Sequence, residues 1–221
     1  TDFPTLLIRT AHAVVSMQDA ALMAQSLIAN VPDSSVGGQI QHDANVGINK
    51  EVGLSVSYIE QAVLFDDGFS VTLRKPVWHL ESHYKDEGYD FDTESVFSAR
   101  VAPPMIGLGL IELIDEAEII GRLDPEDGNG DGISGRLQLV TDAVTSETRI
   151  GRFGWKATQP SVRQQVAAAL NTDVGVMTSV MPNPDCGSSQ TNCGTAGAEL
   201  SDQHLDELSA YIALLGVSAR R

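Results

Sequence analysis

The stretch "GLSVSYIEQAVLFDDGFSVTLRKPVWHL", residues 53–80, holds two runs rich in β-branched and aromatic residues on either side of Asp66-Asp67-Gly68. Apolar and polar residues alternate in both runs, which is typical of strands that present two different faces. An Asp-Gly pair between such runs favours a tight turn, because glycine adopts positive φ without steric cost. We therefore predict a β-hairpin at the centre of a β-rich subdomain over residues 36–85.

The segments that flank this subdomain are predicted to contain helices. In residues 19–28, Ala, Leu and Met recur at helical spacing, whereas residues 6–15 are compatible with a strand or a helix. Residues 1–35 thus form a partly helical N-terminal segment. After the hairpin, the best-defined helix begins at an N-cap, Ser201, and ends at Gly216. Two further helices are predicted, over residues 115–123 and 159–170.

Composition predicts a folded, acidic chain. Of its 221 residues, 42% are hydrophobic and 20% are charged, and the net charge is -16. Such a charge repels phosphate backbones and anionic lipid headgroups, so we expect neither nucleic acid nor a membrane surface as a partner. The longest mostly apolar run, residues 105–114, is about half as long as a bilayer-spanning helix. No membrane insertion is therefore expected.

The acidic loop "DPEDGNGDGISGR", residues 124–136, has the spacing of a calcium loop. Asp127, Asn129 and Asp131 alternate before a glycine, and the carbonyl of Ile133 would add a further oxygen ligand for Ca²⁺. However, the twelfth position is Gln138, which cannot supply the charged bidentate clamp of an EF-hand. The remaining ligands would be Asp124, Glu126, Asp142 or water. The alternative is an exposed loop held by Asx turns.

The two cysteines, Cys186 and Cys193, lie in a loop rich in Gly, Ser, Asn and Pro. Their spacing matches neither a metal site nor a C-x-x-C redox pair, so a disulfide that closes the loop is favoured over two free thiols. A disulfide would place the protein in an oxidising compartment, either the periplasm or the cell exterior.

Few other residues indicate chemistry. His79 and His83 have the i, i+4 spacing of a helical metal site, but the surrounding residues favour a strand that runs into a loop. Hydrolase and nucleotide-binding motifs are absent from the sequence. Trp155 stands between a glycine and a lysine, where a tryptophan is usually a packing anchor. An indole can also relay an electron if a redox centre lies beside it.

Several long motifs resemble those of the bacterial di-haem oxidoreductases, which are also called thiol oxidoreductases and are regarded as peroxidase-like. The similarity covers about residues 36–221, and residues 1–35 are similar only weakly. The motifs occur in the family's order: "GGQIQ" (37–41), "GFSVTLRKPVWHL" (68–80), "RVAPPMIGLGLIELI" (100–114), the loop 124–136, "GRFGWKATQPSVRQQVAAALNTDVGV" (151–176), and the C-x₆-C loop followed by residues 200–221.

The resemblance implies an α+β fold. It would be a mainly helical lobe, like cytochrome c and the di-haem peroxidases, over residues 86–221, with a subdomain rich in β-hairpins. It also implies two covalent haems c at C-x-x-C-H motifs and electron transfer between them towards peroxide or a similar oxidant. An electron-donor protein or a small-molecule reductant would be the partner.

This sequence contains no C-x-x-C-H motif. Since the chain starts at Thr1 without a leader, we expect it to be the segment between the two haems of a longer protein and to be inactive alone. The alternative is a haem-free, calcium-stabilised secreted module that binds a partner or serves as a scaffold.

The resemblance also implies roles for individual residues. Trp155 matches, loosely, a tryptophan that relays electrons between haems, and Phe153 is part of the same stretch. Pro103, Pro104 and Met105 resemble a turn that faces haem, although a methionine there is more often part of the core. Ca²⁺ gives structural order in related families, which favours a metal at the loop of residues 124–136.

Overall fold

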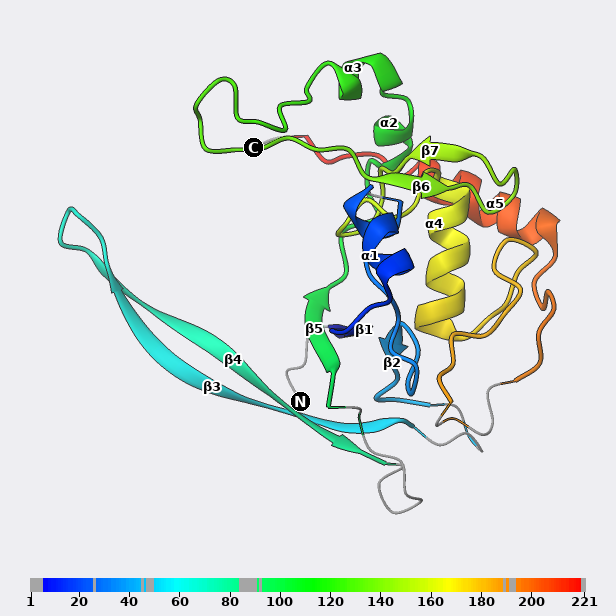
Figure 1. Ribbon diagram of the computed structural model, residues 1–221, viewed down its shortest axis with the longest axis horizontal. Helices are drawn as coiled ribbons and strands as arrows, with labels where there is room; N and C mark the ends of the chain where they lie inside the picture. The colour runs from blue at the N-terminus through cyan, green and yellow to red at the C-terminus, as the bar shows by residue number, and fades with distance from the viewer. Residues whose placement is uncertain are drawn as a thin grey trace.

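The computed structural model describes residues 6–25, 27–44, 46, 50–83, 91, 93–188, 190 and 194–219. These residues form three antiparallel sheets beside a small group of short helices (Figure 1). The elements, in order, are β1 (Leu6–His12), α1 (Met17–Ala24), β2 (Gln39–Ile40), β3 (Val52–Leu64), β4 (Ser70–Ser82), β5 (Ser95–Val101), α2 (Leu108–Glu112), α3 (Glu116–Ile120), β6 (Leu139–Thr141), β7 (Thr148–Ile150), α4 (Val162–Ala169), η2 (Leu170–Val174) and α5 (Asp202–Ala213).

The central sheet has the strand order β2-β1-β5. Strand β1 pairs with β5 along its whole length, from Leu6 opposite Val101 to His12 opposite Ser95. Its side chains alternate between buried and half-buried, so Leu6 and Ile8 face the core, as expected of a strand. One sheet thus takes strands from all three predicted segments, 1–35, 36–85 and 86–221.

The predicted hairpin is confirmed. Strands β3 and β4 pair in register from Val52 opposite Ser82 to Leu64 opposite Ser70. The turn places Gly68 at φ +83°, in the left-handed region that favours glycine. The base of the hairpin packs into the core of the central sheet, and the rest projects from the body as a long arm (Figure 1).

A second core holds the helices together. Buried side chains of α4 and α5 pack on one another, with Phe153 and Val180 beside them. The hydroxyl of Ser201 accepts a hydrogen bond from the backbone N–H of His204, so the predicted N-cap of α5 is confirmed. Helix α4 lies within the predicted range 159–170, but it begins two residues after Pro160, with Ser161 as its N-cap, and passes into the π-helical turn η2.

The prediction of a mainly helical, cytochrome c-like lobe is wrong. The five α-helices in the described residues have only 8, 5, 5, 8 and 12 residues, whereas β3 and β4 have 13 residues each. Helices α2 and α3 are both short: α2 starts only after Gly107, which is in the left-handed conformation, and α3 ends at Gly121, because glycine disfavours the helix. The fold is therefore α+β with sheets as its most extensive elements. Among the described residues, no helix has the length and apolar character required to span a bilayer.

Candidate functional site

The local backbone holds Trp155 on the surface next to a buried anchor. Phe153 is 3% exposed and lies in the helical core, whereas Trp155, two residues later, is 61% exposed. Gly154 at φ +81° reverses the chain between them. The indole N–H donates to the carbonyl oxygen of Val101 at 2.8 Å, so the ring is fixed in orientation while much of it stays exposed. Phe153 therefore anchors this stretch of backbone in the core while Trp155 lies at the surface.

Several exposed apolar side chains belong to segments that are hydrogen-bonded to one another near Trp155, and we call this set the apolar surface. They come from the end of β5, the turn before α2, α2 itself and the chain after α5. The members are Val101, Met105, Ile106, Leu110, Leu113, Trp155, Leu214 and Val217, each between 47% and 84% exposed. Pro103 and Pro104 are exposed in the same turn as Met105. Sequence analysis indicated Trp155 and the turn, but it did not indicate the contribution of the C-terminal segment.

Two sets of contacts hold the segments of this surface together. The N–H of Gly107 donates to the carbonyl oxygen of Leu215 at 2.9 Å, which ties α2 to the end of α5. The Nη1 of Arg152 donates to the carbonyl oxygens of Ile111, Glu112 and Ile114 at 3.1, 3.1 and 2.6 Å. A cationic donor at the C-terminal end of α2 satisfies carbonyls that the helix leaves free. The surface therefore rests on a fixed backbone.

The loop of residues 124–136 has the geometry of successive Asx turns. Asp127 accepts from the N–H of Gly132, Asn129 from the N–H of Asp131, and Asp131 from the N–H of Ile133. Each carboxylate or amide oxygen is thus directed at backbone donors within the loop. No group of three metal-ligating side chains of the His, Cys, Asp or Glu type occurs among the described residues. Calcium binding by this loop stays a prediction.

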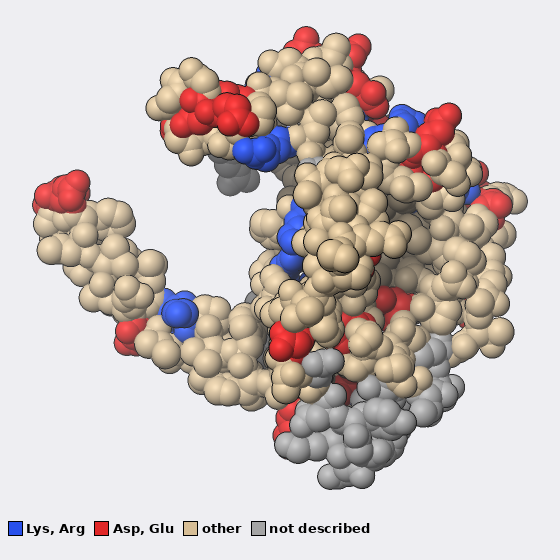
Figure 2. Space-filling view, viewed as in Figure 1, with Lys and Arg blue, Asp and Glu red and all other residues tan. Residues whose placement is uncertain are grey.

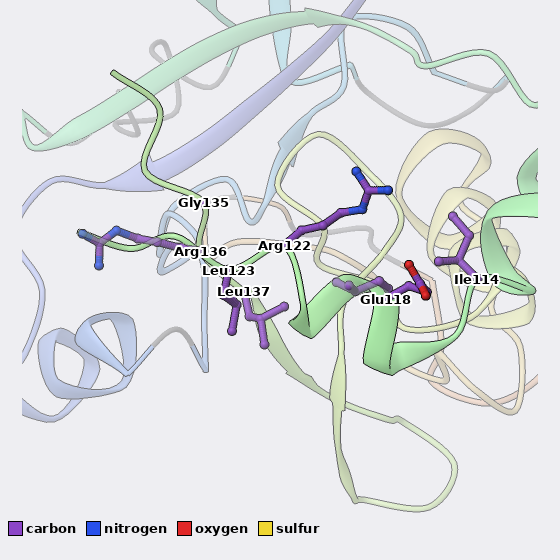
Figure 3. Close-up of a pocket in the computed structure, with 8 residues that line it drawn as sticks. Ile114, Glu118, Arg122, Leu123, Gly135, Arg136 and Leu137 are labelled. Carbon is purple, nitrogen blue, oxygen red and sulfur yellow. The ribbon is translucent and has the colours of Figure 1, made fainter. Parts of the chain in front are cut away.

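A shallow pocket of about 280 Å³ lies between α3 and the chain that leaves the acidic loop. Figure 3 shows the side chains of Arg122 and Arg136 pointing in different directions from its walls. The volume is just below the range usual for ligand sites, and no carboxylate pairs with a base inside it. The pocket therefore supports no catalytic role.

A buried polar cluster joins the central sheet to the turn after α4. Gln39 donates through Nε2 to the carbonyl of Thr172 and to Oδ1 of Asp173, both at 2.9 Å. The N–H of Gln41 donates to Oε2 of Glu51 at 2.7 Å, and Asp185 lies against the backbone of Gly38. Arg9 is near Asp173 and Asp185, and burial lowers its pKa.

Glu51 is the most deeply buried charged residue of this cluster, at 1% exposed. Burial raises the pKa of its carboxyl from 4.5 to about 7, although the hydrogen bond from Gln41 acts in the opposite direction. Sequence analysis missed both Glu51 and Asp185. Its one signal was the motif "GGQIQ", which forms β2 and its approach, but a glutamate next to a lysine ordinarily indicates an exposed site.

Other predicted sites receive less support. The pairing of Cys186 with Cys193 stays a prediction, because Cys193 lies outside the described residues. His79 belongs to strand β4 and contacts the hydroxyl of Ser57 at 2.9 Å, as the strand interpretation of that stretch predicted.

The sequence was compared with families, curated proteins and solved structures. The model of one family, described as "Di-haem oxidoreductase, putative peroxidase", matches residues 6–221. This chain belongs to the di-haem oxidoreductase family. No curated protein and no solved structure matches it.

The residues of this di-haem oxidoreductase chain fit a haem in one respect only. The apolar surface, with its exposed indole, suits contact with a flat apolar macrocycle. The sequence offers no covalent attachment point for haem, because its two cysteines do not form a C-x-x-C-H motif.

Acidic side chains are prominent at two places on the surface in Figure 2, the tip of the β3–β4 arm and the loop of residues 124–136.

Proposed function

We propose that this chain is the scaffold of a c-type di-haem enzyme that carries electrons to peroxide or a similar oxidant, with the apolar surface in contact with haem. The observation that supports this most is the position of Trp155 in a chain of the di-haem family. Its indole is exposed, yet the hydrogen bond to the carbonyl oxygen of Val101 orients it, and Phe153 anchors the adjacent backbone in the core. A relay residue must combine these two properties.

When bound, haem supplies the one-electron chemistry that the side chains of the protein cannot perform. The chain itself would orient the haem and shield it from water. Met105 and Leu110 would exclude water from the macrocycle's face, which raises the strength of electrostatic interactions there. Arg152 keeps the carbonyls of the α2 end paired, so that no free carbonyl dipole faces the apolar surface.

The remaining parts of the proposal concern the setting of the enzyme. A periplasmic or secreted location would suit covalent haem and a disulfide between Cys186 and Cys193. An electron-donor protein or a small-molecule reductant would supply electrons. Calcium at Asp127, Asn129, Asp131 and the carbonyl of Ile133 would stiffen the acidic loop beside the pocket.

The experiment uses the intact protein as its gene encodes it. Its absorbance spectrum is recorded first, and a Soret band that survives denaturation shows covalent haem. The rate at which peroxide oxidises the reduced protein is then measured in a single turnover. In the Trp155→Phe variant we expect electron transfer between the haems to slow by about tenfold or more, with an unchanged spectrum.

Trp78→Phe is the matched control, because Trp78 is the only other tryptophan and lies half-buried in β4, against the core of the central sheet. This variant should transfer electrons at the wild-type rate. Equal rates in all three proteins would contradict the relay role. An intact protein without a Soret band would contradict the haem enzyme and favour the haem-free scaffold module.

A further inference from the structure

Unpaired buried oxygens concentrate at one place in this protein. Among the described residues, four buried side-chain oxygens have no hydrogen-bond partner, and three of them are Oε1 of Gln39, Oε1 of Glu51 and Oδ2 of Asp185. An unpaired buried polar atom costs about 1–3 kcal/mol, and more when it is charged. Three such atoms within the polar cluster therefore indicate a missing ligand.

The backbone of residues 37–38 forms a cradle for Asp185. A Cβ at Gly37 would lie 2.9 Å from Oδ1 of Asp185, and one at Gly38 would lie 3.4 Å from both carboxylate oxygens. Gly37, which also has a φ of +80°, is the position where a side chain would prevent this close approach of the carboxylate. The N–H of Gly38 donates to Oδ1 at 2.9 Å, so that oxygen is anchored and Oδ2 stays unpaired.

Glu51 and Gln39 are held in the same manner, each by one polar atom. Oε2 of Glu51 accepts from the N–H of Gln41, and Nε2 of Gln39 donates to Thr172 and Asp173. The backbone groups that hold Glu51 and Asp185 belong to Gln41 and Gly38, the residues next to β2. Gln39 is itself part of β2, so all three side chains are anchored at this one strand. The negative charge of Asp185 also helps to raise the pKa of Glu51, as expected if the two carboxyl groups lie near each other.

The charges of the cluster do not balance. Glu51, Asp173 and Asp185 carry carboxyl groups, and the basic side chain of Arg9 interacts with Asp173 and Asp185. The Nη2 of Arg9 donates to the hydroxyl of Thr172 at 3.4 Å and leaves the three unpaired oxygens without a donor. A water molecule has two protons to donate, so it would leave one of three acceptors unpaired and the negative charge unchanged.

We propose that Gln39, Glu51 and Asp185 bind a divalent cation with oxygen ligands, for which Ca²⁺ is the best match. Two carboxylates and an amide oxygen are ligands that Ca²⁺ prefers, and it tolerates the irregular geometry that three separate chain segments impose. Mg²⁺ demands a tighter octahedron, and Zn²⁺ prefers nitrogen and sulfur. The ion would tie β2, the start of β3 and the segment after η2 together, apart from the loop of residues 124–136.

Calcium titration of the intact protein, stripped with a chelator and followed by calorimetry, tests the site. The variants are Glu51→Gln and Asp185→Asn, and the control is the double variant Asp127→Asn with Asp131→Asn. We expect wild type and the control to retain the buried site, and the first two variants to lose one equivalent of Ca²⁺ or bind it at least about tenfold more weakly. A wild type that binds no Ca²⁺ below about 1 mM, or unchanged binding in both variants, overturns the proposal.

Thermal unfolding gives a second readout that separates binding from damage to the fold. Without calcium at pH 8, where the Glu51 carboxyl is ionised, Glu51→Gln removes a buried unpaired charge, so this variant should melt at or above the wild-type temperature. With calcium, wild type should gain stability by mass action and Glu51→Gln should not. If Asp185→Asn fails to fold, the calcium response of Glu51→Gln decides alone: a wild-type rise in that variant overturns the site.

Discussion

At the scale of single residues, Glu51 determines how stability depends on pH. Its carboxyl has a pKa of about 7 in the folded protein, raised by burial from 4.5. Between these values the folded state binds more protons than the unfolded state, so the free energy of unfolding falls as pH rises through this window. Above about pH 7 the loss is complete.

We therefore predict that Glu51→Gln flattens the pH profile of stability. In chelator, the free energy of unfolding of wild type should fall relative to this variant by about 2–3 kcal/mol between pH 4.5 and pH 8, because each unit of pKa shift is worth about 1.4 kcal/mol. Urea unfolding at several pH values measures this. Parallel profiles for the two proteins would show that the carboxyl titrates normally.

At the same scale, the sequence did not show which residues of the proposed haem-facing stretch are buried and which are exposed. Phe153 and Trp155 belong to one motif, but the first is in the core and the second is exposed. The reversal at Gly154 causes this difference, and a local pattern cannot show which side of the reversal the core occupies. Likewise, Asp127 and Asp131 have metal-loop spacing, but their oxygens accept backbone hydrogen bonds in the loop.

At the scale of elements, the contact of α2 with α5 depends on the absence of a side chain at Gly109. A Cβ there would overlap the backbone carbonyl of Ala213 in α5. Backbone cannot yield as a flexible side chain can, so the two helices would have to separate. This contact positions α2, which supplies Leu110 to the apolar surface.

We predict that Gly109→Ala destabilises the protein by about 1–3 kcal/mol, despite the higher helix propensity of alanine. The control is Gly216→Ala, since a Cβ at Gly216 meets nothing within 4 Å. Thermal unfolding of both variants measures the difference. Equal stability of Gly109→Ala and the control would mean that α2 does not pack closely on α5 in solution.

At the scale of the whole molecule, the chain exposes far more surface than its mass requires. Its accessible area is 14385 Å², whereas a compact monomer of 23.6 kDa would expose about 9,800 Å². The arm of β3 and β4, which projects from the body of the molecule, contributes to the excess (Figures 1 and 2), as do the exposed side chains of the apolar surface. A large exposed apolar surface is usually covered by a partner in a functional assembly.

The proposed function predicts that haem covers the apolar surface, which is one part of the excess accessible area. In the intact protein, Leu110→Glu should lower the stability of the haem-loaded form by about 1–3 kcal/mol, because the charge would be desolvated against the macrocycle. Val144→Glu is the control, since Val144 is 67% exposed, close to the 62% of Leu110, but lies between β6 and β7. Thermal unfolding followed at the Soret band measures both. Equal effects of the two substitutions would contradict haem contact at the apolar surface.

Local patterns in the amino-acid order were sufficient for the hairpin turn at Gly68, the N-cap Ser201 and the family. These features depend on neighbours along the chain, so short-range geometry decides them. The balance of sheet over helix and the meeting of Gln39, Glu51 and Asp185 depended on the tertiary structure. Pairing of β1 with two distant strands, and the approach of Asp185 to Gly38 across 147 positions of sequence, arise only when the chain buries its apolar faces together.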